Sequence, residues 1–170
     1  MYEPHSFTHQ RSETEGGFAS GLPWPASEGT PDSVVTMLET QMDIAGLDPA
    51  EQARNLQAVA PFIAEYFAEG WGEAQMVARV GEAVAWAKAN SIPTSRLFMG
   101  EFGAILMSAD GRMGAFDADR RRYLAALRTE AERHDIPWAI WEYSNPYGMT
   151  VILPTGPAVP DAKMLKALGM

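Results

Sequence analysis

Two short apolar segments, 95–99 and 136–143, are the clear interior strands of the sequence, and a helical pattern separates them. Strands that alternate with helices of ten or more residues are typical of parallel βα units. A third strand is available only if residues 1–4 form the end of one. Because two or three parallel strands leave unpaired edges, which natural proteins avoid, the pattern indicates either an unusual small α/β domain or part of something larger.

Helical patterns account for most of the remaining sequence. Asp32 and Asp48 are the expected N-caps of the first two helices, and Pro49 occupies a first helical position. Residues 1–31 are rich in glycine and proline and are predicted to form a long irregular loop. Apolar residues at helical spacing, cap signals or both predict helices over 33–45, 48–68, 72–90, 118–134 and 161–168, and a short extended piece over 149–153.

The charge balance argues against nucleic acid as a partner. The 170 residues carry a formal net charge of -9, which gives an acidic surface. The densest basic cluster, Arg120 to Arg122, falls within a helical pattern and is predicted to be a solvated helix face or a local donor of ion pairs.

The sequence gives no sign of a cofactor, a metal or a membrane anchor. It contains no cysteine, so thiolate metal sites and disulfides are excluded, and its three histidines lack carboxylates at metal-ligand spacing. No apolar run has the length of a membrane span, and the first residues lack the charged-then-apolar pattern of a signal peptide. Localisation therefore stays open, with the cytoplasm as the default if residue 1 is the natural start.

Glu101 has a placement that is typical of a reactive carboxylate. It follows the apolar segment 96–99, and Gly100 and Gly103 flank it, so a ligand could approach it closely. The alternative is a glutamate at the end of a strand that hydrogen-bonds a loop. The segment 99–103 alone does not decide between them.

Four blocks of the sequence together resemble the carboxyl-terminal half of family 5 glycoside hydrolases, the cellulase-type (β/α)8 barrels. Residues 2–10 are similar to the block at the end of the sixth strand, and Leu-Pro-Trp-Pro at 22–25 is similar to the stretch that follows it. Gly-Glu-Phe-Gly at 100–103 matches the seventh-strand motif that holds the nucleophile. The block 138–143 matches the eighth-strand block that forms the floor of the sugar-binding site.

This resemblance implies an α/β fold, a partial (β/α)8 TIM barrel with roughly strands 6 to 8 and their helices. Residues 1–170 would form a single carboxyl-terminal portion of a catalytic barrel. Within it, 1–31 would be the loop after strand 6, 95–103 the nucleophile strand and 136–143 the last barrel strand.

The implied activity is retaining hydrolysis of a β-linked polysaccharide by an endo-β-1,4-glucanase-like enzyme, with no cofactor. Glu101 would be the nucleophile, and the phenol of Tyr2 would orient its carboxylate. Trp141 is the expected sugar platform, because an indole face packs on the apolar face of a pyranose. A frayed terminal residue is the alternative for Tyr2.

Further substrate contacts are weaker predictions. His5 and His9 are candidates in a polar loop, with ordinary surface histidines as the alternative. Trp24 is either a second sugar-stacking side chain or a loop anchor. Trp138 is expected in the core, and Glu142 is expected to face a helix or bond a loop.

Two departures from the family pattern limit the expected activity. The family histidine that precedes Tyr2 by two positions would fall one position before Met1. The Asn-Glu-Pro motif that holds the acid/base glutamate does not occur in this sequence. We therefore expect little or no activity from this chain alone, and a non-catalytic carbohydrate-binding fragment or a gene-model artefact of a longer enzyme are the alternatives.

The expected partner is a β-glucan or a related polysaccharide, with no nucleic acid and no membrane. Which β-glycan is bound stays open. Exposed strand edges would also permit self-association. Enzymes of this family are commonly secreted or periplasmic.

Overall fold

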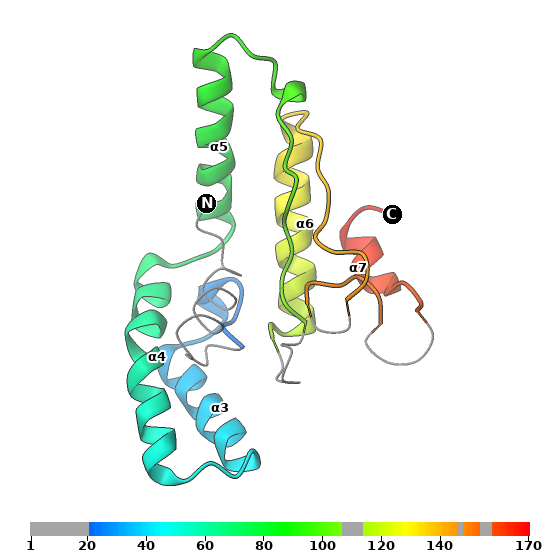
Figure 1. The fold of residues 1–170 in the computed structure, drawn as a ribbon. Coiled ribbons are helices and arrows are strands. Elements are labelled where there is room, and N and C mark those ends of the chain that lie inside the picture. The colour runs from blue at the N-terminus through cyan, green and yellow to red at the C-terminus, as the bar shows by residue number, and fades with distance from the viewer. Residues whose placement is uncertain (1–20, 107–113, 146–147, 154–157) are drawn as a thin grey trace.

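The computed structural model describes residues 21–106, 114–145, 148–153 and 158–170, and this part of the chain is mostly helical (Figure 1). Two short 3-10 helices accompany five α-helices in the described residues. In chain order they are η1 Ala26–Glu28, α3 Pro31–Ile44, α4 Pro49–Glu69, α5 Glu73–Ala89, η2 Thr94–Arg96, α6 Asp117–Arg133 and α7 Ala162–Ala167.

Local capping explains where the first two of these α-helices begin and end. Thr30, and not the predicted Asp32, caps α3, because Thr30 and Ser33 exchange side-chain hydrogen bonds in a capping box. Asp48 caps α4 as predicted and accepts the Glu51 amide at 2.9 Å. Gly70 ends α4 with a φ of 62°, a left-handed conformation that favours glycine. None of the described helices is both long and apolar enough to cross a membrane.

The two predicted strands are reduced to a single parallel bridge between Met99 and Trp138. The Met99 amide donates to the Pro137 carbonyl and the Ala139 amide donates to the Met99 carbonyl, both at 2.9 Å. The first part of the predicted strand lies instead in η2. The predicted lengths of 95–103 and 136–143 as strands were therefore wrong, although their parallel pairing is present.

A bulge interrupts the pairing directly at Glu101. In a regular parallel ladder the Trp141 amide would bond the carbonyl two residues after Met99, but it bonds Phe102 at 2.9 Å. The other bridge in the described residues is antiparallel and joins Ile152 to Pro160. With no third strand beside them in the described part of the chain, these segments do not form a regular sheet, so the predicted strands 6 to 8 of a barrel are not confirmed.

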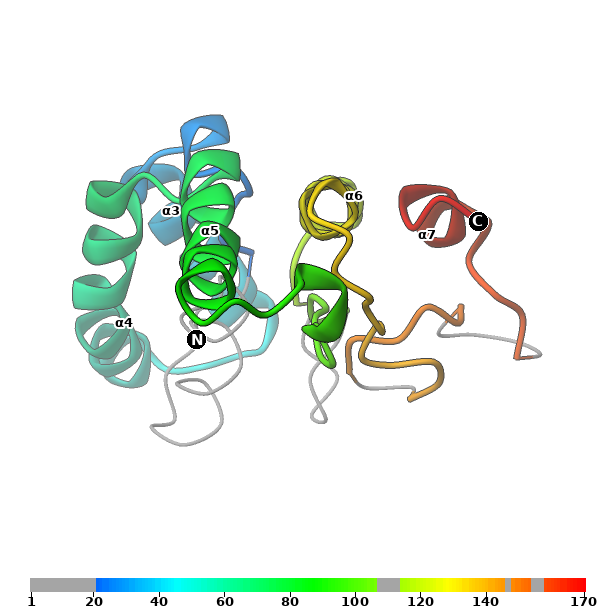
Figure 2. The ribbon, with the colours of Figure 1, turned by 90° about the horizontal axis from the view of Figure 1, so that it is seen from above.

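The helices pack around two hydrophobic cores. Seen from above, α3 and α4 lie at one end of the molecule and α6 and α7 at the other, with α5 between them (Figure 2). The first core joins η1, α3 and α4, and its buried residues include Leu38, Val59 and Ile63. The second core joins α5, α6, α7 and the extended segments, and includes Phe102, Leu124 and Met164.

Residues 22–26 connect the two cores. Leu22 is buried in the first core and Trp24 in the second. The Tyr66 hydroxyl of α4 donates to the Pro23 carbonyl, and the Trp24 amide donates to the buried Asp119 carboxylate of α6 at 3.0 Å. The Leu-Pro-Trp-Pro segment therefore links α4 to α6 through hydrogen bonds.

Candidate active site

Glu101 lies on the surface at the end of the parallel pair. Its neighbour Phe102 is fully buried and meets Trp138 edge-on, with ring centroids 5.6 Å apart. Glu101 is exposed, whereas residues 102–105 that follow it are buried. No described residue donates a hydrogen bond to the Glu101 carboxylate, so the loop-bonding alternative finds no support in the described part of the chain.

Trp141 lies on the neighbouring segment, and its backbone pairs with that of Phe102. Its amide donates to the Phe102 carbonyl at 2.9 Å, which sets the Trp141 backbone next to the residue that follows Glu101. The Trp141 side chain is 49 % exposed, and the peptide bond to Glu142 is cis. The structure thus pairs the backbone of Trp141 with the residue that follows Glu101, and both Trp141 and Glu101 are exposed.

Gly103 allows the two segments to approach each other. A Cβ atom at Gly103 would overlap the Trp141 carbonyl oxygen and would lie 2.8 Å from the Met149 side chain. Gly100 differs, because a Cβ atom there would meet only the ring of Phe98, at 3.2 Å. The sequence suggested that both glycines admit a ligand, whereas the structure shows that Gly103 serves close packing of the backbone.

Glu142 and Trp138 have structural contacts. Glu142 accepts a hydrogen bond from the Asn145 amide at 2.9 Å, in agreement with the loop-bonding role expected for it. Trp138 is partly buried against the second core, in agreement with the expected core position. We therefore do not count Glu142 or Trp138 among the candidate ligand contacts.

The prediction of Trp24 as a sugar-stacking residue was wrong. Its side chain is only 7 % exposed and packs edge-on against Tyr123, with ring centroids 5.8 Å apart. A sugar cannot stack on an indole that α6 already covers. The alternative of a loop anchor describes Trp24 correctly.

Three further candidates, Tyr2, His5 and His9, lie outside the described residues. Their expected roles as orienting phenol and substrate contacts stay predictions. Among the residues that the structure does describe, no group of three or more histidine, aspartate or glutamate side chains could hold a metal ion.

Arg120 differs from its prediction. The sequence predicts a solvated helix face or a local donor of ion pairs, but Arg120 is 1 % exposed and is among the largest fully buried side chains. Its Nε donates to the Ala104 carbonyl at 3.0 Å and its Nη2 to the Thr150 carbonyl at 2.7 Å. Burial lowers the pKa of the Arg120 guanidinium to about 10, against the opposing effects of Asp117 and Asp161, so the group is still charged at neutral pH.

The helical period contained a signal for this burial. Positions 123, 124, 127 and 131 form the buried stripe of α6, and position 120 precedes the first two of them by three and four residues. The other two arginines of the cluster follow the prediction: Arg121 pairs with Asp117, and Arg122 pairs with Asp119 and Glu28.

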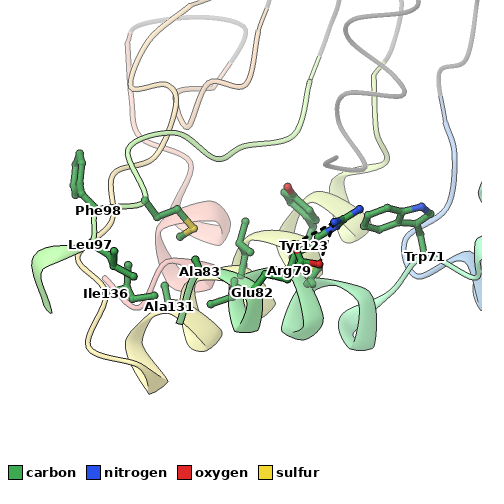
Figure 3. Close-up of a pocket in the computed structure, with 13 residues that line it drawn as sticks. Trp71, Arg79, Glu82, Ala83, Leu97, Phe98, Tyr123, Ala131 and Ile136 are labelled. Atoms are coloured by element: carbon green, nitrogen blue, oxygen red, sulfur yellow. Dashed lines mark hydrogen bonds and ion pairs between the residues drawn. The ribbon is translucent and has the colours of Figure 1, made fainter. Parts of the chain in front are cut away.

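A cavity of about 520 Å³ lies between α5, α6 and the segment 97–99 (Figure 3). Its wall is largely apolar, with Trp71, Leu97 and Ile136, and the Arg79–Glu82 ion pair lies along it (Figure 3). Neither Glu101 nor Trp141 lines this cavity. Glu101 and Trp141 are both exposed.

Comparison with known proteins gave partial structural similarities. No protein-family model matches the sequence, and no curated protein does. The solved structures that are similar include the cellulose synthase subunit Z of Clostridioides difficile, with 27 % identity and a TM-score of 0.45 over 56 % of this chain and 28 % of that one. A hyperthermophilic endo-beta-1,4-glucanase has 24 % identity and a TM-score of 0.46 over 58 % of this chain and 28 % of its own.

A third structure, Thermotoga maritima Cel5A in complex with cellobiose, has 23 % identity and a TM-score of 0.46 over 56 % of this chain and 27 % of its own. The matched region thus spans little more than a quarter of each of these proteins. All three TM-scores are below 0.5.

Proposed function

We propose that this chain is part of a retaining O-glycosyl hydrolase that acts on a β-linked polysaccharide. The proposal is supported by the hydrogen bond from the Trp141 amide to the Phe102 carbonyl, because it pairs the segment of the exposed Trp141 with the residue that follows the exposed Glu101. An aromatic platform next to a carboxylate is what a glycosidase needs to hold a pyranose against its nucleophile.

In the proposed reaction, the Glu101 carboxylate attacks the anomeric carbon from the face opposite the leaving oxygen. The bond from the anomeric carbon to that oxygen breaks, a covalent glycosyl ester forms on Glu101, and water then releases the sugar with retention. Trp141 stacks on the apolar face of the sugar and holds the anomeric carbon near the carboxylate.

A second carboxyl group must protonate the leaving oxygen, and this sequence lacks the Asn-Glu-Pro motif that holds it in the resembled family. Glu142 does not supply this second carboxyl group in this structure, because its carboxylate accepts a hydrogen bond from the side-chain amide of Asn145. We infer that the chain carries the nucleophile half of a two-carboxylate site.

The test separates the nucleophile from the missing acid. A dinitrophenyl β-cellobioside has a leaving group that departs as a stable anion and needs no proton, whereas a β-glucan does need one. We expect the chain to release dinitrophenolate slowly and to leave β-glucan intact. Glu101→Gln should abolish the release, and Glu142→Gln, a matched change at a neighbouring carboxylate, should retain it. Release that survives Glu101→Gln would remove Glu101 from the mechanism.

A non-catalytic carbohydrate-binding role is the second candidate, and the half-exposed Trp141 favours it. In this case cellotetraose should bind equally well to Glu101→Gln and to the unmodified chain in calorimetry. Trp141→Ala should weaken the affinity about tenfold or more, which is roughly 1.4 kcal/mol. Trp86→Ala is the matched control, because Trp86 is also exposed, at 56 %, but lies on α5. No release of dinitrophenolate together with this binding would favour the second candidate.

A further inference from the structure

Arg120 lies where two independent effects oppose a buried cation. It belongs to the first turn of α6, near the positive end of the helix dipole, which disfavours a positive charge. Its side chain is also removed from water, and burial of a charge is costly. The charges of Asp117 and Asp161 favour the buried cation, and its hydrogen bonds to the Ala104 and Thr150 carbonyls add to this compensation.

These contacts join the two segments of the candidate active site. The Ala104 carbonyl, three residues after Glu101, accepts from Nε of Arg120. The Thr150 carbonyl accepts from Nη2, and the Thr150 hydroxyl donates to the carbonyl of Tyr143, two residues after Trp141. One planar guanidinium thus donates hydrogen bonds to backbone carbonyls of both segments.

Other hydrogen bonds between the two segments join backbone groups. Trp141 donates to Phe102, and Leu106 donates to Gly148 at 2.8 Å. The bulge at Glu101 leaves the pairing without a regular ladder. Arg120 is a side chain that bonds both segments at once, in addition to these backbone bonds and the close approach at Gly103.

We propose that Arg120 is a positioning residue that sets the distance between the nucleophile segment 101–104 and the platform segment, which comprises residues 141–145 and 148–150. The proposal rests on the proposed function for its consequence in catalysis, but its structural part stands without that function. Arg120 does not touch the sugar; it acts through the backbone of Ala104 and Thr150.

The experiment measures hydrogen exchange of backbone amides in Arg120→Met, Arg120→Lys and the unmodified chain. Arg121→Met is the matched control, because Arg121 follows Arg120 on α6 and pairs with Asp117 near the surface. In Arg120→Met we expect the amides of Leu106 and Trp141 to exchange roughly tenfold faster or more, with amides of α3 and α4 unchanged. Arg120→Lys, which keeps the charge but not the fork, should give an intermediate effect.

Labelling of Glu101 by a 2-fluoro-cellobiosyl donor supplies the catalytic readout. The maximal rate of labelling should fall about tenfold or more in Arg120→Met and be partly restored in Arg120→Lys, because small misplacement of a reacting group is costly. The inference is overturned if exchange at Leu106 and Trp141 is unchanged, or if α3 and α4 exchange faster to the same extent. If Arg120→Met does not fold, Arg120→Lys decides by the same criteria. If the unmodified chain is not labelled while the exchange effect is found, the proposed function fails and the structural role of Arg120 stands.

Discussion

At the scale of single residues, the site depends on which side chains are exposed and which are packed. Phe102 is buried and anchors the segment, whereas the adjacent Glu101 is exposed. Trp141, the expected sugar platform, is half-exposed, whereas Trp24, for which the sequence left a sugar-stacking residue and a loop anchor open, is covered by α6. Periodicity could not separate them, because Trp24 lies in an irregular segment.

The two glycines of the Gly-Glu-Phe-Gly motif should respond differently to the same change. Gly103→Ala is expected to destabilise the protein by about 1–3 kcal/mol, because the added methyl group overlaps the backbone of Trp141, which cannot move away cheaply. Gly100→Ala meets only the edge of an exposed phenylalanine ring and should cost less. Urea unfolding of both variants measures the difference. Equal losses would show that Gly103 is not required for the approach of the two segments.

At the scale of elements, the sequence predicted the helices well and the strands poorly. The bounds of α4, α5 and α6 follow from local signals, namely the Asp48 cap, the glycine at position 70 and the stripe of apolar residues on each helix. The extended segments depend on neighbours that a local pattern cannot supply, so 95–103 became a 3-10 turn, one bridge and a bulge. The Gly-Glu-Phe-Gly motif at 100–103 could be identified from the sequence because its four residues are contiguous.

The N-terminus of α3 gives a direct test of the capping box. Thr30→Ala removes the side chain that accepts the Ser33 amide and should cost about 1 kcal/mol, or roughly 2–4 °C in Tm. Thr40→Ala is the matched control, because the Thr40 hydroxyl only bonds the Thr36 carbonyl one turn earlier in α3, and it should be close to neutral. A larger loss in Thr40→Ala than in Thr30→Ala would contradict the assignment of the cap.

At the scale of the whole molecule, the segment 22–26 joins two cores that would otherwise share few contacts. Leu22 belongs to one core and Trp24 to the other, and the hydroxyl of Tyr66 bonds the backbone between them. Burial, with a smaller contribution from the Asp119 carboxylate, raises the pKa of Tyr66 well above its ordinary value. The joint is therefore held by a phenol that must stay protonated.

This joint should make the protein sensitive to alkali. The raised pKa means that the folded state holds the Tyr66 proton more tightly than the unfolded state does. The resulting stability is fully present below the ordinary tyrosine pKa of about 10 and is lost as the pH rises through and beyond it. Thermal unfolding between pH 8 and 11 should show a steeper loss of stability in the unmodified chain than in Tyr66→Phe. Parallel curves for the two proteins would contradict this role of Tyr66.

The most direct measurement of the proposed function is the trapping of a covalent intermediate on Glu101. A 2-fluoro-β-cellobiosyl donor with a dinitrophenolate leaving group needs no general acid, and the fluorine slows release of the sugar from the ester. We expect mass spectrometry of the digested protein to find one cellobiosyl adduct, on the peptide that contains Glu101, and none in Glu101→Gln. An adduct on a different carboxylate, or no adduct on a protein that binds cello-oligosaccharide, would show that Glu101 is not a glycosidase nucleophile.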